Sequence, residues 1–306
     1  MSTTGTVLVT GATGTTGSRT AARLIAGGHR VRAASRRATP LPGAEPVRFD
    51  WYDPGTHGPA LEGADRVHLV PPVGDGDPAA VMLPFLRRAR AAGVRRVVLL
   101  SSSAIPEGGP AVGAVHAALP GLFDEWAVLR PSWFMQNFTG THAHAVSIRE
   151  EGVIMTAAGS GRVGFVDADD IAAVAVRALT DDDAPGTDLV LTGPEALGYD
   201  DVAAILGDVL GRPVVHRRLT YEQMRDRLTA QVPPDFAAML AAMDSAIADG
   251  AEDRTTDAVE RLTGRPPHGF RAVVERELVR GGVIRPAGAP GAVVPSPLDC
   301  FVLRFD

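Results

Sequence analysis

Apolar and polar positions along this chain alternate with two periods, which predict strands and helices in turn. An apolar run at residues 7–9 is followed by glycines and then by residues 18–25, where Ala21, Leu24 and Ile25 share one helical face. Further apolar runs predict strands within residues 29–37, 47–50, 65–70, 96–103 and 126–137. Some of these ranges also include the loop that follows the strand. Because a helical pattern at 78–92 also separates two of them, we expect an α/β fold: a Rossmann, doubly wound parallel sheet.

The second half of the chain has a different, mainly helical pattern. A short strand and a helix start are predicted at 161–172, and one more strand at 188–192. Thr220 and Gln223 form a capping box for a helix over 221–228, and an amphipathic helix is predicted at 235–249.

These patterns predict two domains. We expect residues 1–150 to form a Rossmann domain that binds NADP(H). Elements near residues 163–180 are expected to return to this domain. Residues 151–306 are expected to form mainly a smaller, mostly helical substrate domain, with a glycine- and proline-rich flexible tail from about residue 281.

Composition and charge restrict the partners. The 306 residues are 45% hydrophobic and 22% charged, and no apolar run approaches the ~18 residues of a membrane span. The N-terminus has no basic region typical of a signal peptide, so we expect a cytoplasmic protein with no membrane partner. A net charge of −6 without a basic stripe argues against nucleic acid. The chain has one cysteine, Cys300, so an intramolecular disulfide is excluded. A homodimer is possible.

All 30 basic residues are arginines, so the chain contains no lysine. This absence has a chemical consequence whatever its origin in codon usage. A Schiff-base lysine, a P-loop lysine and a Tyr-x-x-x-Lys proton-donor pair are all excluded.

The most informative motif is the glycine-punctuated turn that follows the first apolar run. Gly11, Gly14 and Gly17 are spaced three apart, with Thr13, Thr15 and Thr16 between them. Such glycines allow a tight turn, a close approach to a pyrophosphate and packing of the following helix, whose unpaired N–H groups face the phosphates. The motif predicts a dinucleotide site; the alternative is a tight strand-to-helix turn without a ligand.

The end of the second predicted strand indicates which dinucleotide is bound. Residues 31–38 contain no acid to accept from the ribose hydroxyls and offer Ser35, Arg36 and Arg37 instead. A guanidinium fork suits a 2′-phosphate, so NADP(H) is the expected cofactor, although one of the two arginines could be a solvated surface residue. At the same sheet edge, further cofactor contacts are expected from Asp50 near the adenine and from Val70, Pro71 and Pro72 near the ribose and nicotinamide.

Candidate substrate residues follow the sixth predicted strand. An aromatic, amide-bearing turn there consists of Trp133, Phe134, Met135, Gln136 and Asn137. These residues are expected to line a substrate pocket, with core packing as the alternative. Weaker candidates for catalysis are Ser101, Ser102 and His116; the helix expected around His116 contains Gly113 and Pro120 and should be short or irregular.

Other polar residues are interpreted as structural. His142 and His144 stand two apart without a nearby acid or cysteine, and we expect surface histidines and no metal site. Asp167, Asp169 and Asp170 are expected to be caps and dipole partners of a helix. Tyr199 and Tyr221 begin predicted helices and are expected to be packing residues.

Together these motifs resemble the NmrA-like branch of the atypical short-chain dehydrogenases/reductases. The resemblance covers roughly residues 5–280 and implies a Rossmann domain with a small C-terminal substrate domain. Relatives often carry Tyr or His and Lys after the fifth strand, where residues 105–122 supply only His116. The motifs that carry the resemblance lie at residues 10–17, 35–37, 99–102, 129–137, 165–172, 191–195 and 262–267.

The branch includes NADPH-dependent quinone and azo-dye reductases, iminium reductases and redox-sensing regulators. Because the usual proton-donor pair is absent, we expect an NADPH-dependent reductase that transfers hydride to a small, apolar conjugated acceptor: a quinone, an enone, or a cyclic imine or iminium. Two alternatives are an NADP(H)-sensing regulator without turnover and a non-redox cyclase or isomerase on the same fold.

Overall fold

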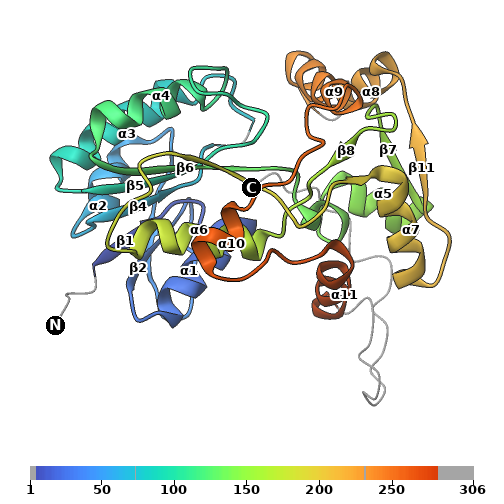
Figure 1. Cartoon of the computed structure of the whole chain (residues 1–306). Coiled ribbons are helices and arrows are strands. Elements are labelled where there is room, and N and C mark those ends of the chain that lie inside the picture. Colours follow the sequence, from blue (N-terminus) through green and yellow to red (C-terminus); the bar gives the residue numbers. More distant parts are fainter. Residues whose placement is uncertain (1–4, 73, 231, 282–306) are drawn as a thin grey trace.

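Seven strands of the described chain form one parallel sheet, which is the centre of the larger lobe (Figure 1). The computed structural model describes residues 5–72, 74–230 and 232–281. The strand order is β3-β2-β1-β4-β5-β6-β9, and the order reverses between β1 and β4. The strands are β1 (Thr6–Val9), β2 (Arg30–Ser35), β3 (Glu45–Arg48), β4 (Arg66–Leu69), β5 (Arg96–Leu100), β6 (Glu125–Pro131) and β9 (Asp188–Leu191). The predicted doubly wound α/β fold is confirmed.

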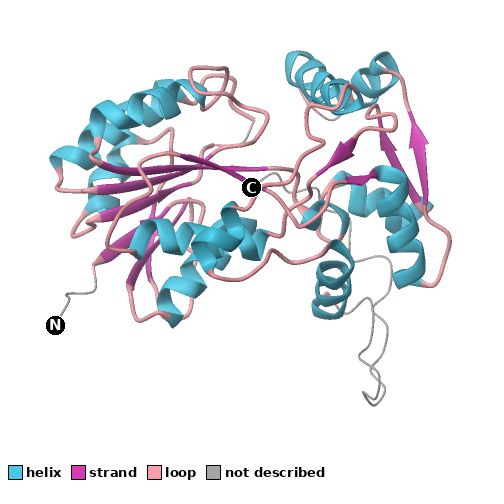
Figure 2. Ribbon diagram, viewed as in Figure 1, coloured by secondary structure: helices cyan, strands magenta, loops and turns pink. Residues whose placement is uncertain are grey.

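Helices cover both faces of this sheet (Figure 2). One face carries α2 (His57–Leu61) with the 3₁₀ turn η1 (Pro54–Thr56), α3 (Ala79–Ala91) and α4 (Gly113–Leu122); the other carries α1 (Thr15–Ala26), α6 (Ala168–Thr180) and α10 (Ala258–Thr263). Successive strand residues alternate between the two cores: Leu8 packs with Met82 under α3, whereas Val7 and Val9 pack with Leu24 of α1. Both faces are therefore buried, as a parallel sheet requires.

The smaller lobe is built mainly of helices and lies beside the carboxyl ends of the strands (Figure 1). Two pairs of strands add to it, one antiparallel (β8 with β10) and one parallel (β7 with β11). Its elements are η2 (Met135–Phe138), α5 (Ala143–Glu151), β7 (Val153–Thr156), β8 (Arg162–Val163), β10 (Leu197–Gly198), α7 (Tyr199–Leu210), β11 (Val215–Arg218), α8 (Tyr221–Thr229), α9 (Pro234–Ala248) and α11 (Phe270–Arg280).

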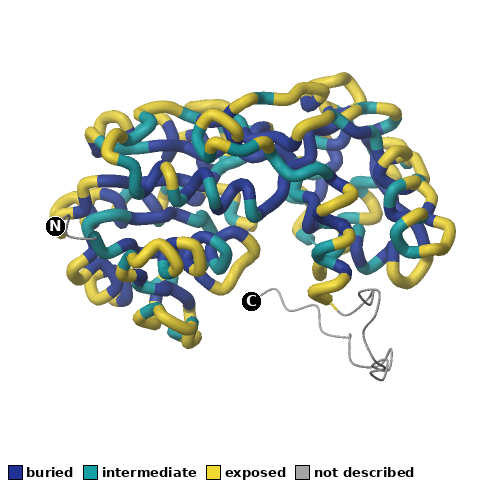
Figure 3. Tube along the Cα trace, turned by 60° about the horizontal axis from the view of Figure 1, so that its bottom comes forward, coloured by how far each residue is buried: buried dark blue, intermediate teal, exposed yellow. Residues whose placement is uncertain are grey.

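The two lobes interleave along the sequence. The smaller lobe begins with η2, before residue 150, and the chain returns to the larger lobe in α6, β9 and α10. Each lobe encloses its own buried residues, and the core of the smaller one joins Phe138, Phe165 and Phe270 from distant parts of the chain (Figure 3).

Local signals in the sequence located several helices well. The capping box is formed, since Gln223 N–H donates to Thr220 Oγ1 at 3.2 Å, and α8 begins at Tyr221. The helix at His116 is longer than expected: α4 runs for 10 residues because Gly113 is its first residue and Pro120 lies near its end. None of the described helices is long and apolar enough to cross a membrane. Cys300 and the tail after Gly281 lie outside the described residues.

An ion-pair network joins the lobes at the start of α6. Asp167 caps α6 by accepting from Asp169 N–H at 3.1 Å, as expected, but Asp167 and Asp170 are also fully buried. Asp167 accepts from Arg276 of α11 at 2.9 Å, and Asp170 accepts from Arg265 at 2.7 Å. The interpretation as helix caps is therefore incomplete, because Asp167 is also the buried half of an interlobe ion pair and Asp170 binds Arg265 in the segment between α10 and α11.

We predict that Asp170→Ala destabilises the protein by about 3–5 kcal/mol, because it leaves a guanidinium and the His268 N–H without their buried acceptor. Asp208→Ala is the control: Asp208 pairs with Arg271 at 2.8 Å on the surface, and its loss should cost less than about 1 kcal/mol. Urea denaturation followed by circular dichroism measures both. Equal costs for the two variants would contradict the assignment of the network as a buried, stabilising one.

Candidate functional site

The glycine turn follows β1 and is closed by contacts that exclude side chains. Gly11 has a φ of +59°, in the left-handed region, and a Cβ there would lie 3.0 Å from the Cβ of Val70. Gly14 N–H donates to the Gly11 carbonyl at 2.9 Å. A Cβ on Gly17 would overlap the Gly11 carbonyl oxygen, so the first turn of α1 is packed directly on the backbone of the loop.

The start of α1 offers unpaired donors to solvent. Gly14 is its N-cap and has no side chain to accept from the first-turn N–H groups, and no acid lies in that turn. Thr13 and Thr15 are exposed at this end of the helix, whereas Thr16 is buried beneath it. This arrangement attracts an anion such as a pyrophosphate.

Three further predicted cofactor segments lie at the carboxyl ends of β2, β3 and β4. Ser35 is buried at the end of β2, where its Oγ accepts from Thr39 N–H at 2.9 Å and shapes the loop that carries the exposed Arg36 and Arg37. The Asp50 carboxylate accepts from Tyr52 N–H at 3.0 Å, so it also stabilises its own turn.

Residues 70–72 adjoin the glycine turn, since Val70 N–H donates to Thr10 Oγ1 at 2.7 Å. Val70, Pro71 and Pro72 are half-buried. The structure thus brings the predicted cofactor residues to one edge of the sheet.

The serines after β5 have different environments. Ser101 Oγ is buried and has no hydrogen-bond partner among the described residues, whereas Ser102 Oγ accepts from Ala104 N–H at 3.3 Å. Ser103 Oγ donates to the buried carboxylate of Glu252 at 2.8 Å. No local sequence pattern marks Glu252, because it approaches the end of β5 from the loop after α9. Among the three, Ser101 is the one with a free hydroxyl group.

His116 lies in the helical layer on one face of the sheet. It is buried on α4, and its ring centroid is 6.3 Å from that of Trp126, at the beginning of β6. The serines and the aromatic turn lie at the opposite ends of β5 and β6. This position fits a packing histidine.

The aromatic turn after β6 divides its side chains between the two lobes. Trp133 and Asn137 line a cavity, Phe134 packs on the core of the larger lobe, and Met135 is buried in that of the smaller one. The amide of Gln136 is already bound, since Nε2 donates to Asp167 Oδ1 at 2.8 Å and Oε1 accepts from Ala168 N–H at 2.9 Å. Gln136 therefore holds the start of α6.

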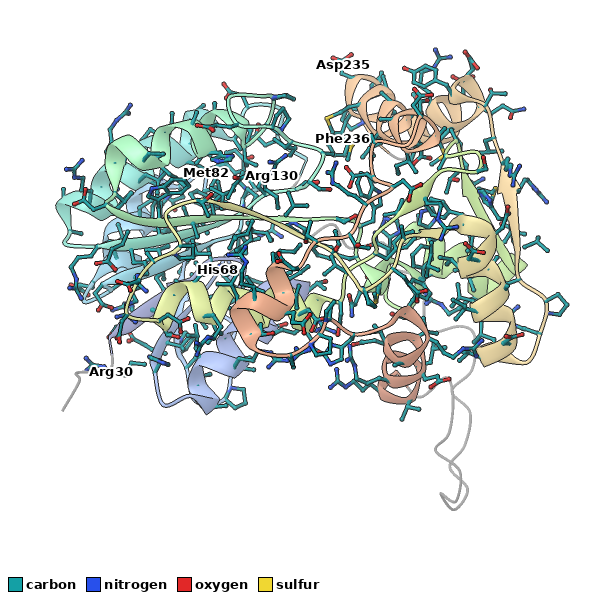
Figure 4. All side chains as sticks on the ribbon, viewed as in Figure 1. Arg30, His68, Met82, Arg130, Asp235 and Phe236 are labelled. Carbon is teal, nitrogen blue, oxygen red and sulfur yellow. The ribbon has the colours of Figure 1, made fainter. Side chains whose placement is uncertain are left out.

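The cavity has a volume of about 160 Å³ and lies between η2, α5, α8 and α9. Its walls are largely apolar, with Met155, Met224 and Met243 among the lining side chains. The polar groups on its walls include Asn137, His144, Ser147, Arg227 and Asp244. In the view of Figure 4, the labelled Asp235 and Phe236 place the start of α9 above the end of the sheet where Arg130 lies.

His144 is not the surface residue expected from the sequence. Its ring stacks on Phe138 with centroids 5.5 Å apart and planes at 7°, and burial lowers its pKa to about 3. His142 is exposed, as expected, and caps α5 by accepting from His144 N–H at 3.2 Å. The ring centroids of the two histidines are 4.9 Å apart, because His142 precedes the helix and His144 lies in its first turn.

The two tyrosines expected to be packing residues differ. Tyr199 is buried among Phe138, Phe165 and His216. Tyr221 is only half-buried, and the Arg225 guanidinium lies 5.9 Å from the centre of its ring. Only Tyr199 is a core residue.

Asp244 is the one acid among the described residues that line the cavity. It is 8% exposed, and its Oδ2 accepts from Ala157 N–H at 2.9 Å. Burial raises its pKa to about 6, and the hydrogen bond from Ala157 offsets only part of this. No pattern in the sequence marked Asp244, since an acid within a helix is usually solvated.

A glycine turn against α1 at the switch point of a parallel sheet defines a dinucleotide-binding Rossmann protein. The chain belongs to the family described as NAD(P)H-binding, which it matches over residues 11–182. It is 49% identical over 262 residues to an uncharacterised oxidoreductase, YesF, of Bacillus subtilis, covering 85% of this chain and 91% of that protein. It is 40% identical over 275 residues to agroclavine dehydrogenase of Claviceps fusiformis, covering 87% and 94%. The protein is thus an oxidoreductase of this family.

Solved structures share the fold. Triphenylmethane reductase of Citrobacter sp., complexed with NADP(H), superposes with a TM-score of 0.72 at 24% identity, covering 89% of this chain and all of that one. The negative transcriptional regulator NmrA, in complex with NAD, superposes with a TM-score of 0.67 at 17% identity, covering 90% and 98%. These superpositions show the fold that the resemblance to NmrA-like proteins implied, and the family match shows its NAD(P)H-binding domain.

We predict that Gly17→Ala weakens NADPH binding by about tenfold or more, because the methyl group displaces the Gly11 backbone and removes phosphate contacts. Gly58→Ala is the control, since a Cβ at Gly58 would meet no described atom within 4 Å. Fluorescence titration with NADPH measures both variants. Unchanged affinity in folded Gly17→Ala protein would contradict the role of this turn.

Asp244 predicts a dependence of stability on pH. Its pKa is raised from 3.8 to about 6, so its contribution to stability is complete below pH 3.8 and is lost as the pH rises through 6. Asp244→Asn keeps the acceptor for Ala157 and has no charge to lose. Between pH 4 and pH 8 its unfolding free energy should therefore gain about 2 kcal/mol relative to the wild type. Urea denaturation at both pH values tests this, and a constant difference would contradict it.

Proposed function

We propose that the protein is an NADPH-dependent reductase that transfers hydride to a small, apolar conjugated acceptor. The observation that carries this proposal is the cavity of about 160 Å³, whose lining residues Trp133 and Asn137 directly follow β6 at the sheet edge that holds the glycine turn. Ligands of open α/β sheets bind at this edge. In this proposal, residues 151–306 supply most of the remaining walls.

NADP(H) is supported by the loop after β2, where Arg36 and Arg37 are exposed and residues 31–38 contain no acid. A guanidinium there would bind the 2′-phosphate by charge-assisted hydrogen bonds. Gly11, Gly14, Thr15 and the start of α1 would hold the pyrophosphate. Bound NADPH would supply the hydride, which is two electrons and one proton.

The proposed acceptors follow from the groups that the chain has for moving protons. The chain has no lysine, and His144 is held neutral by burial. A cyclic iminium needs no further proton, because hydride addition at carbon gives a neutral amine. A quinone or enone needs one, which water or the free Ser101 hydroxyl would deliver to the delocalised oxyanion.

A larger cavity, of about 250 Å³, lies between α5, α7 and α11. Its two guanidinium groups already bind the backbone, since Arg212 donates to the Ile148 carbonyl at 2.7 Å and Arg149 to that of Gly140 at 2.8 Å. Because these guanidinium groups are already engaged, it is a weaker candidate for the acceptor. Regulation without turnover and non-redox chemistry stay alternatives to the reductase.

The direct test mixes purified protein and NADPH with representative quinones, conjugated enones and cyclic iminium ions, and follows NADPH oxidation and the reduced product. A reductase consumes one NADPH for each product molecule. NADPH that binds and is never oxidised would instead favour a sensor, and product without NADPH consumption would favour a cyclase or isomerase.

Replacing Arg36 and Arg37 together with alanine should raise the KM for NADPH about tenfold or more, because a charge-assisted contact with the 2′-phosphate is lost. The KM for NADH should change little. Arg30→Ala is the matched control, since Arg30 is exposed at the other end of β2 (Figure 4). Steady-state kinetics with both cofactors decide, and a parallel loss for NADH would contradict 2′-phosphate recognition.

A further inference from the structure

Buried acids in the described chain are almost all paired with a base. Four carboxylates there are buried: Asp167, Asp170, Asp244 and Glu252. Arg276 pairs with the first at 2.9 Å, Arg265 with the second at 2.7 Å and Arg254 with the last at 3.3 Å. This pairing is the general rule, because an isolated buried charge is costly.

Asp244 departs from this rule. Within the described residues, its one hydrogen bond is the one that Oδ2 accepts from Ala157 N–H, and no arginine or histidine lies within ion-pair distance. The carboxyl group lines the cavity, where a ligand has access to it. At a buried acid without a base beside an open cavity, a cationic group of a ligand can complete the pairing.

The other ionisable groups around the cavity do not neutralise Asp244. His142, the N-cap of α5, and His144, in its first turn, have pKa values lowered by loss of solvent around their rings, so both are neutral near pH 7. Tyr199 has its pKa raised by burial and by the charge of Asp244, so it is neutral as well. Arg227 of α8 is exposed at the rim and forms no ion pair with Asp244.

Ser147 supplies a second, independent indication of a ligand. It lies on α5, is 7% exposed and lines the same cavity. Its Oγ is buried and has no hydrogen-bond partner in the described chain, although a buried hydroxyl group is normally satisfied. A polar ligand atom in the cavity would satisfy it.

We infer that Asp244 is an anionic anchor and that the cavity takes a ligand with a positively charged nitrogen, such as an iminium ion or a protonated amine. Trp133 and the three methionines of the cavity surround the apolar part of the ligand, and an aromatic face next to a cation adds to the attraction. The inference rests on the proposed function, since it assigns a chemical class to the same cavity, and it makes Asp244 a specificity-determining residue.

The test compares two probes of similar shape at pH 8, the cation N-methylquinolinium and neutral quinoline, by calorimetric titration of protein saturated with NADP⁺. The wild type should bind the cation about tenfold or more tightly than quinoline. Asp244→Asn should reduce this preference to about twofold or less and leave quinoline binding unchanged. Asp235→Asn is the control, because Asp235 is exposed at the start of the same helix, and it should keep the full preference (Figure 4).

Thermal melting confirms that each variant is folded, and Asp244→Ser provides a second neutral variant if the first does not fold. A wild type without preference for the cation, or a neutral variant that retains it, overturns the anchor. NADPH oxidation is measured in parallel with the same protein. If cation binding depends on Asp244 but NADPH is not oxidised, the reductase alone is refuted. If quinones are reduced but cation binding does not depend on Asp244, the anchor alone is refuted.

Discussion

The contact between Gly17 and the carbonyl of Gly11 is the constraint on which the rest of the arrangement depends. It leaves no room for a Cβ, so α1 begins directly on the loop after β1, with its N–H groups at the edge of the sheet. Two residues further on, Arg19 reaches Glu277 of α11 at 3.1 Å. Helix α1 therefore has two roles, because its N-terminus is the expected anion site and its Arg19 holds the smaller lobe. Through this helix, the edge of the sheet expected to bind the cofactor is connected to the lobe that encloses the cavity.

The features predicted well from the sequence are those that local residues determine. The strands were visible because both faces of a parallel sheet are apolar, and α8 because Thr220 and Gln223 form a capping box within one turn. The glycine turn was visible for the same reason, since its spacing is a local requirement of the backbone. Composition added that no lysine could take part in the chemistry.

The residues that the sequence did not reveal depend on contacts across the chain. Gln136 was expected to face a substrate and binds Asp167 instead, a partner 31 residues away. His144 was expected on the surface and stacks under Phe138, because the aromatic core of the smaller lobe is assembled from distant segments. Asp244 was not noticed, since only folding brings α9 over β7 and encloses its carboxyl group. Such environments cannot be inferred from spacing.

The interleaving of the two lobes has a consequence for how such proteins diversify. Segments of the smaller lobe occur before α6, between β9 and α10, and after α10, so no single cut in the chain separates it from the sheet. A new substrate lobe cannot be acquired by joining one contiguous cassette to a ready-made nucleotide-binding half. Change must instead come separately in the segments of the chain that line the cavity. The helices α8 and α9, which are consecutive in the chain, are the part of that wall that is easiest to exchange as a unit.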